Sequence, residues 1–207
     1  MIAIIDYGMG NLGSVEKALK HIGSSCVITS DASVIDSASG VILPGVGSFA
    51  PAMDELNNRG LIQPIKDCVA SGKPFLGICL GMQLMLEGSE ENGTERGNAD
   101  GIVAGLGLIP GFVRRFPENG LKVPQMGWNK LTDVTGRLLN EGDYVYFVHS
   151  YYCDVADASD VAAKTEYGIK YCSSFERENV FGMQFHPEKS GEAGLNILSK
   201  FASETKA

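Results

Sequence analysis

The chain has 207 residues, of which 44% are hydrophobic and 20% are charged. This length predicts a single domain spanning residues 1–207, and the composition is typical of a globular protein with a sizeable core, not of a collagen-like or disordered chain. The 17 Lys and Arg residues against 25 Asp and Glu residues give a net charge of −8. Such a charge repels phosphate backbones and anionic headgroups, so we expect no nucleic-acid partner and no membrane partner.

The apolar segments are too short to span a membrane. Residues 1–5 lack the basic segment of a secretion signal, and the longest later apolar stretch, residues 75–86, falls short of the roughly 20 residues that a spanning helix needs. The five Cys residues are odd in number and include no C-x-x-C pair. This spacing argues against a disulfide framework and a structural zinc, so we expect a cytoplasmic protein without a metal site.

Short apolar strands alternate with amphipathic helices in the first half of the chain. The hydrophobic pattern predicts strands over residues 2–5, 26–29, 40–43 and 75–79, and helices over residues 15–22, 33–37 and 49–71. The strand at 75–79 is expected to run directly into a helix. Strands separated by helices imply right-handed parallel crossovers, and hence an α/β sheet covered on both faces.

Strand-like segments dominate the second half. They are predicted over residues 106–116, 123–131, 144–154, 161–167, 169–175 and 180–186, followed by a helix over 192–202. We therefore expect a mixed, mostly parallel sheet with an antiparallel portion in this half. Residues 87–101 are polar, acidic and rich in Gly and Asn, which favours a mobile, solvated loop.

The most informative local motif is Gly77-Ile78-Cys79-Leu80-Gly81. A strand that ends in a nucleophile with Gly two residues on either side, and then becomes a helix, matches the nucleophile-elbow pattern with Cys in place of Ser. The glycines leave room for a strained elbow residue, and a helix N-terminus favours the thiolate. Because buried Cys is also common in protein cores, Cys79 needs partners to count as a nucleophile.

Three His residues are available as a base for this thiol. His21 lies on the polar side of the first predicted helix, whereas His149 sits in an aromatic strand and remains possible. His186 is the better candidate because it ends the strand 180–186 on the face opposite the apolar residues. With period two, Glu188 projects to the same side, where it would orient and stabilise the imidazolium. Cys79, His186 and Glu188 are thus the predicted nucleophile, base and orienting group; an ordinary edge pair is the alternative for the last two.

Two neighbouring segments are predicted to complete the site. Gln83 lies one helical turn after Cys79 in an otherwise apolar segment, so it either points at the group that Cys79 attacks or is satisfied by core backbone. The turn Pro44-Gly45-Val46-Gly47 follows a strand whose carboxyl end opens onto the same crevice. Its N–H groups, together with that of Leu80, are expected to stabilise an oxyanion, although a plain turn explains these residues nearly as well.

A competing motif lies after the first strand. Gly8-Met9-Gly10-Asn11-Leu12-Gly13 matches the dinucleotide-binding pattern G-x-G-x-x-G, and Asp31 follows the second strand at about the distance of a ribose ligand. This alternative would make the chain a nucleotide-binding module. The nucleotide-binding alternative does not explain the Cys79 elbow, Gln83 or the His186–Glu188 pair.

Together these residues resemble the class I, triad-type glutamine amidotransferases. The resemblance covers nearly the whole chain and extends to the glutaminase subunits of imidazole glycerol phosphate synthases. Its most specific parts are Met126-Gly127-Trp128-Asn129 and His186-Pro187-Glu188-Lys189-Ser190-Gly191. It implies a flavodoxin-like α/β fold with flanking helices, and no cofactor.

The resemblance also implies an activity and a partner. Cys79, His186 and Glu188 would hydrolyse glutamine to glutamate through a γ-glutamyl thioester. The ammonia would pass to a cyclase subunit with a (β/α)8 barrel, the other half of a heterodimer, which forms imidazole glycerol phosphate and aminoimidazole carboxamide ribotide in histidine biosynthesis. The positions matching the family's glutamine pocket are Gly47, Gln83, Ser150 and Tyr151. The positions matching its subunit interface are Asn11, Met126, Trp128, Tyr151 and Lys189.

One position departs from the family pattern. Gln125 stands where the resemblance leads us to expect His. A Gln at this position keeps the ability to hydrogen-bond but has no titratable group. A paralogue that feeds a different synthase is therefore a second alternative. In either case, ammonia released into water becomes mostly ammonium, which is no nucleophile, so the acceptor site is expected on another chain.

Overall fold

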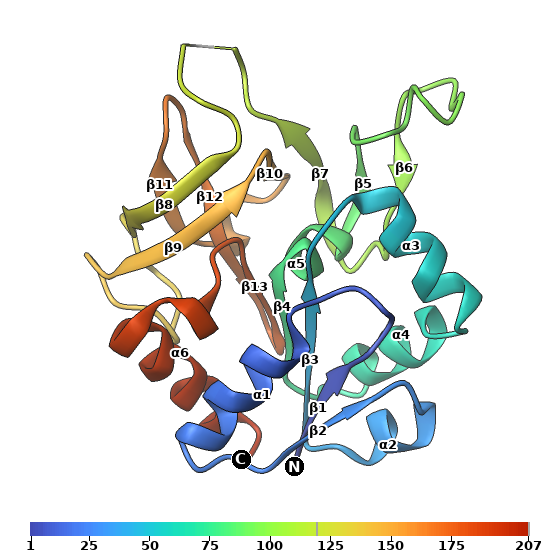
Figure 1. The fold of residues 1–207 in the computed structure, drawn as a ribbon, viewed down its shortest axis with the longest axis vertical. Helices are drawn as coiled ribbons and strands as arrows, with labels where there is room; N and C mark the ends of the chain where they lie inside the picture. The colour runs from blue at the N-terminus through green and yellow to red at the C-terminus, as the bar shows by residue number, and fades with distance from the viewer. Residues whose placement is uncertain (119, 207) are drawn as a thin grey trace.

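A mixed sheet runs through the centre of the molecule (Figure 1). The computed structural model describes residues 1–118 and 120–206, and in this part the sheet has eleven strands in the order β2-β1-β3-β4-β13-β12-β10-β7-β5-β6, with β11 paired to β12. The strands of the first half are β1 (Ile2–Ile5), β2 (Cys26–Thr29), β3 (Gly40–Gly45), β4 (Phe75–Cys79) and β5 (Leu86–Ser89). The remaining strands of this sheet are β6 (Val103–Ala104), β7 (Ile109–Arg115), β10 (Tyr151–Val155), β11 (Val161–Glu166), β12 (Lys170–Arg177) and β13 (Val180–Met183).

The first half follows the predicted alternation of strands and helices. The strands β2, β1, β3, β4 and β13 pair in parallel, and β12 and β10 continue the sheet with antiparallel pairings. The expected mixed α/β sheet with an antiparallel portion is therefore confirmed. In the described residues, no helix is long and apolar enough to cross a membrane. The helices are α1 (Leu12–His21), α2 (Ala32–Ser37), α3 (Phe49–Asn58), α4 (Ile62–Ala70), α5 (Leu80–Leu84) and α6 (Gly191–Glu204).

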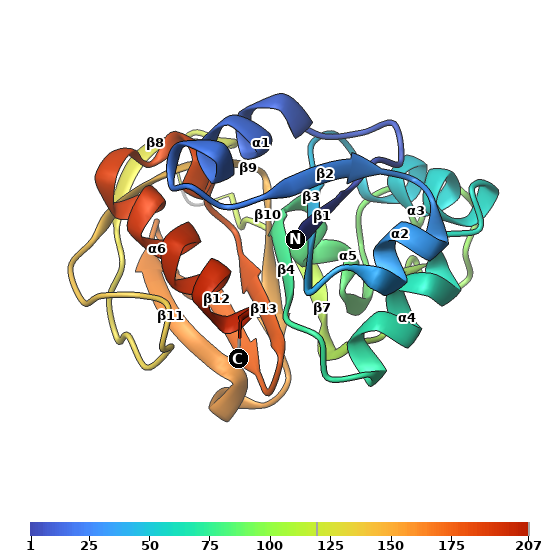
Figure 2. The ribbon, with the colours of Figure 1, turned by 90° about the horizontal axis from the view of Figure 1, so that it is seen from below.

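Helices cover both faces of the sheet, as Figure 2 shows. Because side chains alternate along a strand, Ala3 and Ile5 of β1 pack in one buried cluster with α2, α3 and α4, whereas Ile2 and Ile4 pack in another with α1 and α6. Both clusters are almost fully buried. The sheet is thereby fixed in position, and the carboxyl ends of its parallel strands β2, β1, β3, β4 and β13 open at one edge.

The second half differs from the prediction at three places. The expected strand 144–154 is two strands, because the chain leaves β9 (Tyr144–His149) at Ser150 and enters β10 in the large sheet. β9 pairs instead with β8 (Gln125–Lys130) in a separate two-stranded sheet. The expected strand 180–186 ends at Met183. The expected loop 87–101 begins in β5, where Ser89 is fully buried.

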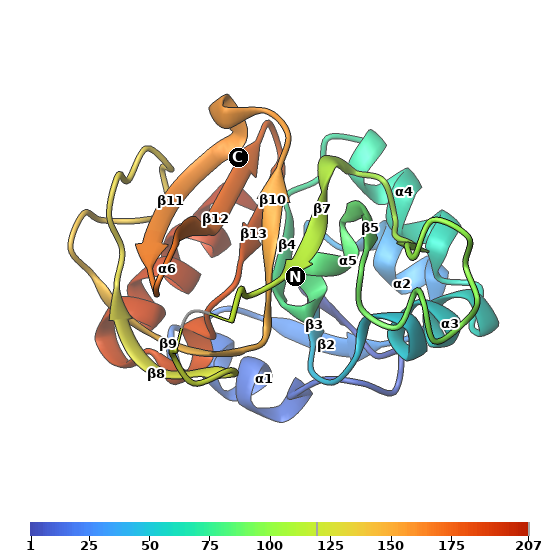
Figure 3. The same ribbon diagram turned by 90° about the horizontal axis from the view of Figure 1, so that it is seen from above.

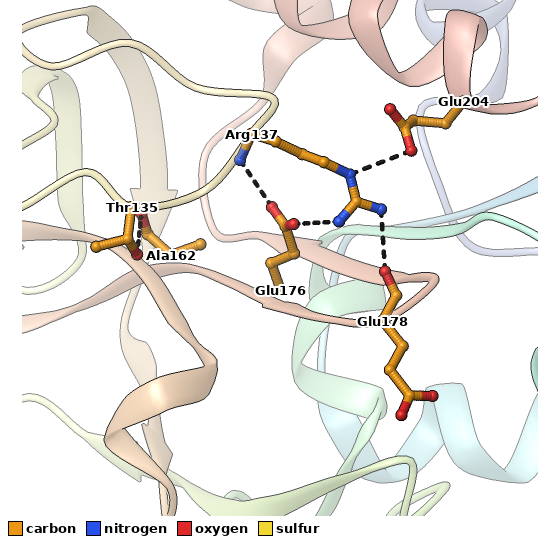
Figure 4. A network of polar contacts seen from close by, with 6 residues as sticks. All are labelled: Thr135, Arg137, Ala162, Glu176, Glu178 and Glu204. Carbon is orange, nitrogen blue, oxygen red and sulfur yellow. Dashed lines mark hydrogen bonds and ion pairs between the residues drawn. The ribbon is translucent and has the colours of Figure 1, made fainter.

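Arg137 anchors the connection between β8 and β9 to the rest of the molecule (Figure 4). Its guanidinium pairs with Glu176 and Glu204 and donates to the carbonyl of Glu178 at 3.0 Å, and it stacks 4.6 Å from the ring centre of Phe181. A single exposed ion pair contributes little to stability, but one guanidinium that joins three groups holds a defined geometry. The two-stranded sheet is thus fastened to the β12–β13 hairpin and to α6.

Candidate active site

Cys79 lies at the sharp turn between β4 and α5. Its backbone has φ 54° and ψ −110°, a positive φ that costs a residue with a side chain about 1–3 kcal/mol. A Cβ on Gly81 would overlap the carbonyl of Leu43, and a Cβ on Gly77 would come within 2.8 Å of the carbonyl of Gly81. Both glycines of the predicted elbow are therefore required by space, and the elbow itself is confirmed.

A cavity of about 400 Å³ opens beside the sulfur of Cys79. This volume suits a small ligand. Six of the seven residues predicted to bind substrate or an oxyanion line it, whereas Gly45 pairs with Cys79 inside the sheet. The lining residues are Val46, Gly47, Cys79, Leu80, Gln83, Glu91, Pro124, Val148, His149, Ser150, Tyr151 and His186.

His186 and Glu188 meet as predicted, but not by the predicted route. Nδ1 of His186 lies 2.8 Å from Oε1 of Glu188, and both side chains are almost fully buried. Since β13 ends at Met183, the period-two argument is wrong here: residues Pro187–Lys189 form a short 3₁₀ helix, η2, which brings Glu188 back to the ring. Pro187 has no N–H for a strand ladder and suits the first turn of a helix.

Three features determine the charge state of His186: its burial, the neighbouring Cys79 and the hydrogen bond with Glu188. Burial lowers the pKa of His186, but the neighbouring thiol of Cys79 and the hydrogen bond with Glu188 outweigh burial and raise it to about 9. Nε2, the nitrogen not used by Glu188, has no hydrogen-bond partner of standard geometry among the described residues. The ring is therefore protonated at neutral pH, and its free N–H is available at the cavity.

Replacing Glu188 by Gln should change how stability depends on pH. Because the pKa of His186 in the folded protein lies above its ordinary value of 6.5, protonated His186 stabilises the fold fully below pH 6.5 and loses this effect as the pH rises through 9. The variant loses one group that raises the pKa. We expect the fall in unfolding free energy between pH 6.5 and 9 to be smaller than in the wild type, by on the order of 1–3 kcal/mol.

Urea unfolding of both proteins at the two pH values measures this difference. Equal falls would show that Glu188 does not hold the proton on His186.

His149 also lines the cavity but is committed to a structural network. Its Nδ1 lies 2.8 Å from the carbonyl of Tyr151 and must carry the proton, since a carbonyl only accepts. Nε2 lies 3.3 Å from the hydroxyl of Tyr171, which in turn contacts Gln125. Burial lowers the pKa of His149 to about 4. The lowered pKa and the commitment of the Nδ1 proton to Tyr151 argue against His149 as the base; His21 is exposed on α1.

Gln83 is buried beside Cys79, and its amide is already hydrogen-bonded. Its Nε2 donates to the carbonyl of Tyr151 and to Oε1 of Gln184, both at 3.0 Å. Both open interpretations of Gln83 are thus partly right: it lines the cavity, and core groups satisfy its donors. With both N–H bonds in use, only its oxygen can contact a ligand.

Glu91 is a cavity residue that the sequence did not single out. Its Oε2 accepts the N–H of Phe49 at 2.8 Å, at the start of α3, and burial raises its pKa. No local pattern separates Glu91 from the other acidic residues of the stretch 87–101, so it could be found only from the folded chain. It places a carboxylate on the cavity wall.

Two residues of the predicted dinucleotide-binding motif, Asp31 and Gly8, make contacts within the protein that explain them without a nucleotide. The carboxylate of Asp31 caps α2 by accepting the N–H of Ser33 at 2.8 Å and its hydroxyl at 2.7 Å. The guanidinium of Arg59 lies against Gly8, so a Cβ there would approach it to 2.6 Å. Helix capping accounts for Asp31, and the side chain of Arg59 covers Gly8, the glycine that forms the tight turn in that motif.

The residues matching interface positions are accessible and lie on neighbouring elements. Met126 and Trp128 on β8 are 64% and 56% exposed, Lys189 is exposed in η2, and Asn11 is partly exposed before α1. Figures 2 and 3 both place β8 and α1 along the same side of the molecule. Trp128 is therefore not a core anchor. Gln125, by contrast, is buried behind this surface.

The known proteins agree with this fold. The chain matches the family described as glutamine amidotransferase class-I over residues 3–205. A solved structure described as a glutamine amidotransferase superposes with a TM-score of 0.77, covering 100% of both chains at 16% identity. Another glutamine amidotransferase, from Thermotoga maritima, has a TM-score of 0.62 at 18% identity, covering 99% of this chain and 83% of its own. The chain therefore belongs to the class I glutamine amidotransferase family.

Within this family, the chain is similar to subunits of imidazole glycerol phosphate synthases. The imidazole glycerol phosphate synthase subunit HisH of Syntrophotalea carbinolica is 49% identical, covering 97% of this chain and 98% of its own length. The subunit of the same name from Bacillus cereus is 48% identical, covering 100% of this chain and 96% of its own. The resemblance seen in the sequence motifs is confirmed at both levels.

Proposed function

We propose that the chain is the glutaminase subunit of an imidazole glycerol phosphate synthase, with Cys79 as nucleophile, His186 as acid and base, and Glu188 as its orienting group. The observation that carries this proposal is the geometry at one cavity: the elbow sulfur, a protonated imidazole with a free N–H, and a buried carboxylate hydrogen-bonded to that ring. Similarity to the HisH subunits supports the choice of synthase.

The chemistry follows from these groups. The protonated ring of His186 favours the thiolate of Cys79, which attacks the side-chain carboxamide carbon of glutamine. The N–H of His186 then passes its proton to the leaving nitrogen, so ammonia departs and a γ-glutamyl thioester remains. Water loses a proton to the now neutral ring, attacks the thioester carbon and releases glutamate. Glu188 keeps the imidazole in one orientation throughout.

The cavity wall supplies groups for binding glutamine. The first N–H groups of α5 have no partner within that helix, so the N–H of Leu80 is the proposed donor to the oxyanion. Gly47 has a positive φ of +103°, a backbone conformation that glycine adopts readily and other residues rarely adopt. Glu91 is suited to the α-ammonium group, because a charged ligand group in a buried site needs an opposite charge. Ser150 and Tyr151 also line the cavity.

The proposed partner is a cyclase subunit with a (β/α)8 barrel, bound on the surface formed by Asn11, Met126, Trp128 and Lys189. An exposed Trp and Met side by side are typical of interface anchors. The heterodimer uses the ammonia to form imidazole glycerol phosphate and aminoimidazole carboxamide ribotide in histidine biosynthesis. We also propose that residues 1–207 form one glutamine amidotransferase domain. The free cysteines of the described residues fit a reducing, cytoplasmic location.

Replacing Met126 and Trp128 together by Ala should weaken the complex with the cyclase. Loss of two such anchors raises the dissociation constant about 100-fold or more, and glutamate production in the presence of the cyclase and its phosphoribulosyl formimino substrate falls accordingly at limiting concentration. Isothermal titration and a coupled glutamate assay measure the two effects. Lys66→Ala, on the helix α4 over the other face of the sheet, should change neither.

The same assay tests the proposed function. Glutamine-dependent consumption of that substrate supports it. If the wild type neither binds the cyclase nor hydrolyses glutamine in its presence, but co-purifies with a different synthase that it supplies with ammonia, the paralogue alternative replaces it.

A further inference from the structure

A second buried amide lies between Gln83 and the sulfur of Cys79. Gln184 has no exposed surface, and its Nε2 donates to Sγ of Cys79 at 3.8 Å. Its Oε1 accepts the hydrogen bond from Gln83. Its main-chain N–H donates to the carbonyl of Ser173 at 2.9 Å. Both the backbone and the side chain of Gln184 are therefore held in place.

One backbone carbonyl fixes the orientation of both amides. Nε2 of Gln83 donates to the carbonyl of Tyr151, and because a carbonyl only accepts, this end of the Gln83 amide must be the NH₂ group. That NH₂ faces the amide of Gln184, which must present its oxygen. The NH₂ of Gln184 is consequently left facing the sulfur, and the assignment follows from the chemistry of the neighbours.

We propose that Gln184 is a further catalytic residue, whose N–H stabilises the thiolate of Cys79 before it attacks. This inference rests on the proposed role of Cys79 as nucleophile. The thiol form of Cys79 has its own partner, the carbonyl of Val148 at 3.9 Å, which only accepts and so favours the protonated sulfur. Gln184 only donates through this nitrogen and so favours the anion.

Gln184 differs from His186 in one respect that matters for turnover. His186 gives up its proton to the leaving ammonia, and at that point it no longer carries a charge. The amide of Gln184 does not titrate, so it remains a donor to the sulfur in every protonation state of the ring. The N–H of Gln184 stabilises the sulfur a second time when the thioester breaks and the sulfur regains its negative charge.

The test is the alkylation rate of Cys79 in the full chain, with Gln184→Met as the variant. Met has a similar length but no donor. Iodoacetamide is applied from pH 6 to pH 10, and the modified Cys79 peptide is quantified by mass spectrometry, which separates it from Cys26. We expect alkylation at pH 7 to be about tenfold slower, the scale of one hydrogen bond to a charged group, and the difference to shrink as the pH rises, because hydroxide then forms the thiolate without help from Gln184.

Two further variants make the result specific. Ser173→Ala changes the neighbouring strand, but its hydroxyl has no hydrogen-bond partner among the described residues, so the wild-type profile is expected. Gln83→Met frees the Gln184 amide to turn and should move the profile in the same direction as Gln184→Met, which keeps the test usable if Gln184→Met does not fold.

Two results would overturn the inference: coincident profiles for wild type and Gln184→Met, or a deficit of equal size at every pH, which indicates a distorted cavity. Alkylation reports on the sulfur itself. If Gln184→Met shows the expected pH-dependent loss of alkylation rate but the wild type does not hydrolyse glutamine, that result contradicts the proposed function alone.

Discussion

Cys79→Ala should lower glutamine hydrolysis by the proposed complex with the cyclase by about 10⁴-fold or more, the scale seen when a catalytic nucleophile is removed. The structure offers no second thiol at the cavity wall among the described residues. The cyclase reaction supplied with ammonium salts should continue, because the variant changes only the ammonia source. Ala keeps the same backbone strain as Cys at φ 54°, so the thermal unfolding midpoint should stay near that of the wild type. Glutamate release and substrate consumption are measured side by side.

The other cysteines serve as internal controls. Burial raises the pKa of Cys68 to about 11 and that of Cys172 to about 12, so both remain unreactive thiols at neutral pH. Cys26 is partly exposed, and Cys26→Ala should keep full activity. A diazoketone analogue of glutamine should label Cys79. Labelling at Cys26 instead, or substantial glutamine hydrolysis by Cys79→Ala, contradicts the assignment.

Gly81→Ala should both destabilise the protein and inactivate it. The added Cβ would overlap the carbonyl of Leu43, and because backbone meets backbone, no flexible side chain can move aside. We expect the unfolding free energy to fall by about 3 kcal/mol or more. Any fold that survives must displace the elbow, and a shift of the sulfur by about 1 Å lowers glutaminase activity at least about 100-fold. Urea unfolding and the coupled assay measure the two losses.

Gly13 provides the matched control on α1. A Cβ on Gly13 meets nothing within 4 Å, and its position inside a helix favours Ala over Gly by up to about 1 kcal/mol. Gly13→Ala should therefore stabilise the protein slightly and leave its activity unchanged. Similar losses in both variants would show that steric overlap at Gly81 is not the cause. Unchanged activity also argues against a nucleotide site at the glycine-rich turn, to which Gly13 belongs.

The elbow turn at Cys79 could be predicted from the sequence because its requirements are local. The elbow needs small residues at Gly77 and Gly81, and those positions stand in the chain two residues from Cys79. The parallel half of the sheet was predictable for a similar reason, since each strand and helix carries its own hydrophobic period.

The parts that could not be predicted depend on contacts between distant segments. The alternation of buried side chains continues through residues 144–154, so nothing local marks the change of sheet at Ser150. The His186–Glu188 contact was predicted correctly from an incorrect local geometry, because either a strand or a 3₁₀ turn can bring these residues together. Glu91 belongs to the site only because α3 starts beside it.

The passage of the chain from one sheet to the other at Ser150 has a mechanical consequence. The exposed residues Met126 and Trp128 lie on the small two-stranded sheet, whereas Tyr151 begins β10 of the large sheet. The Arg137 contacts oppose rotation of the small sheet against the large one, and any such rotation also has to change the torsion angles around Ser150, which is part of the cavity wall. The joint between the two sheets is thus itself part of the cavity wall, so a displacement of the small sheet reaches the cavity through a single residue.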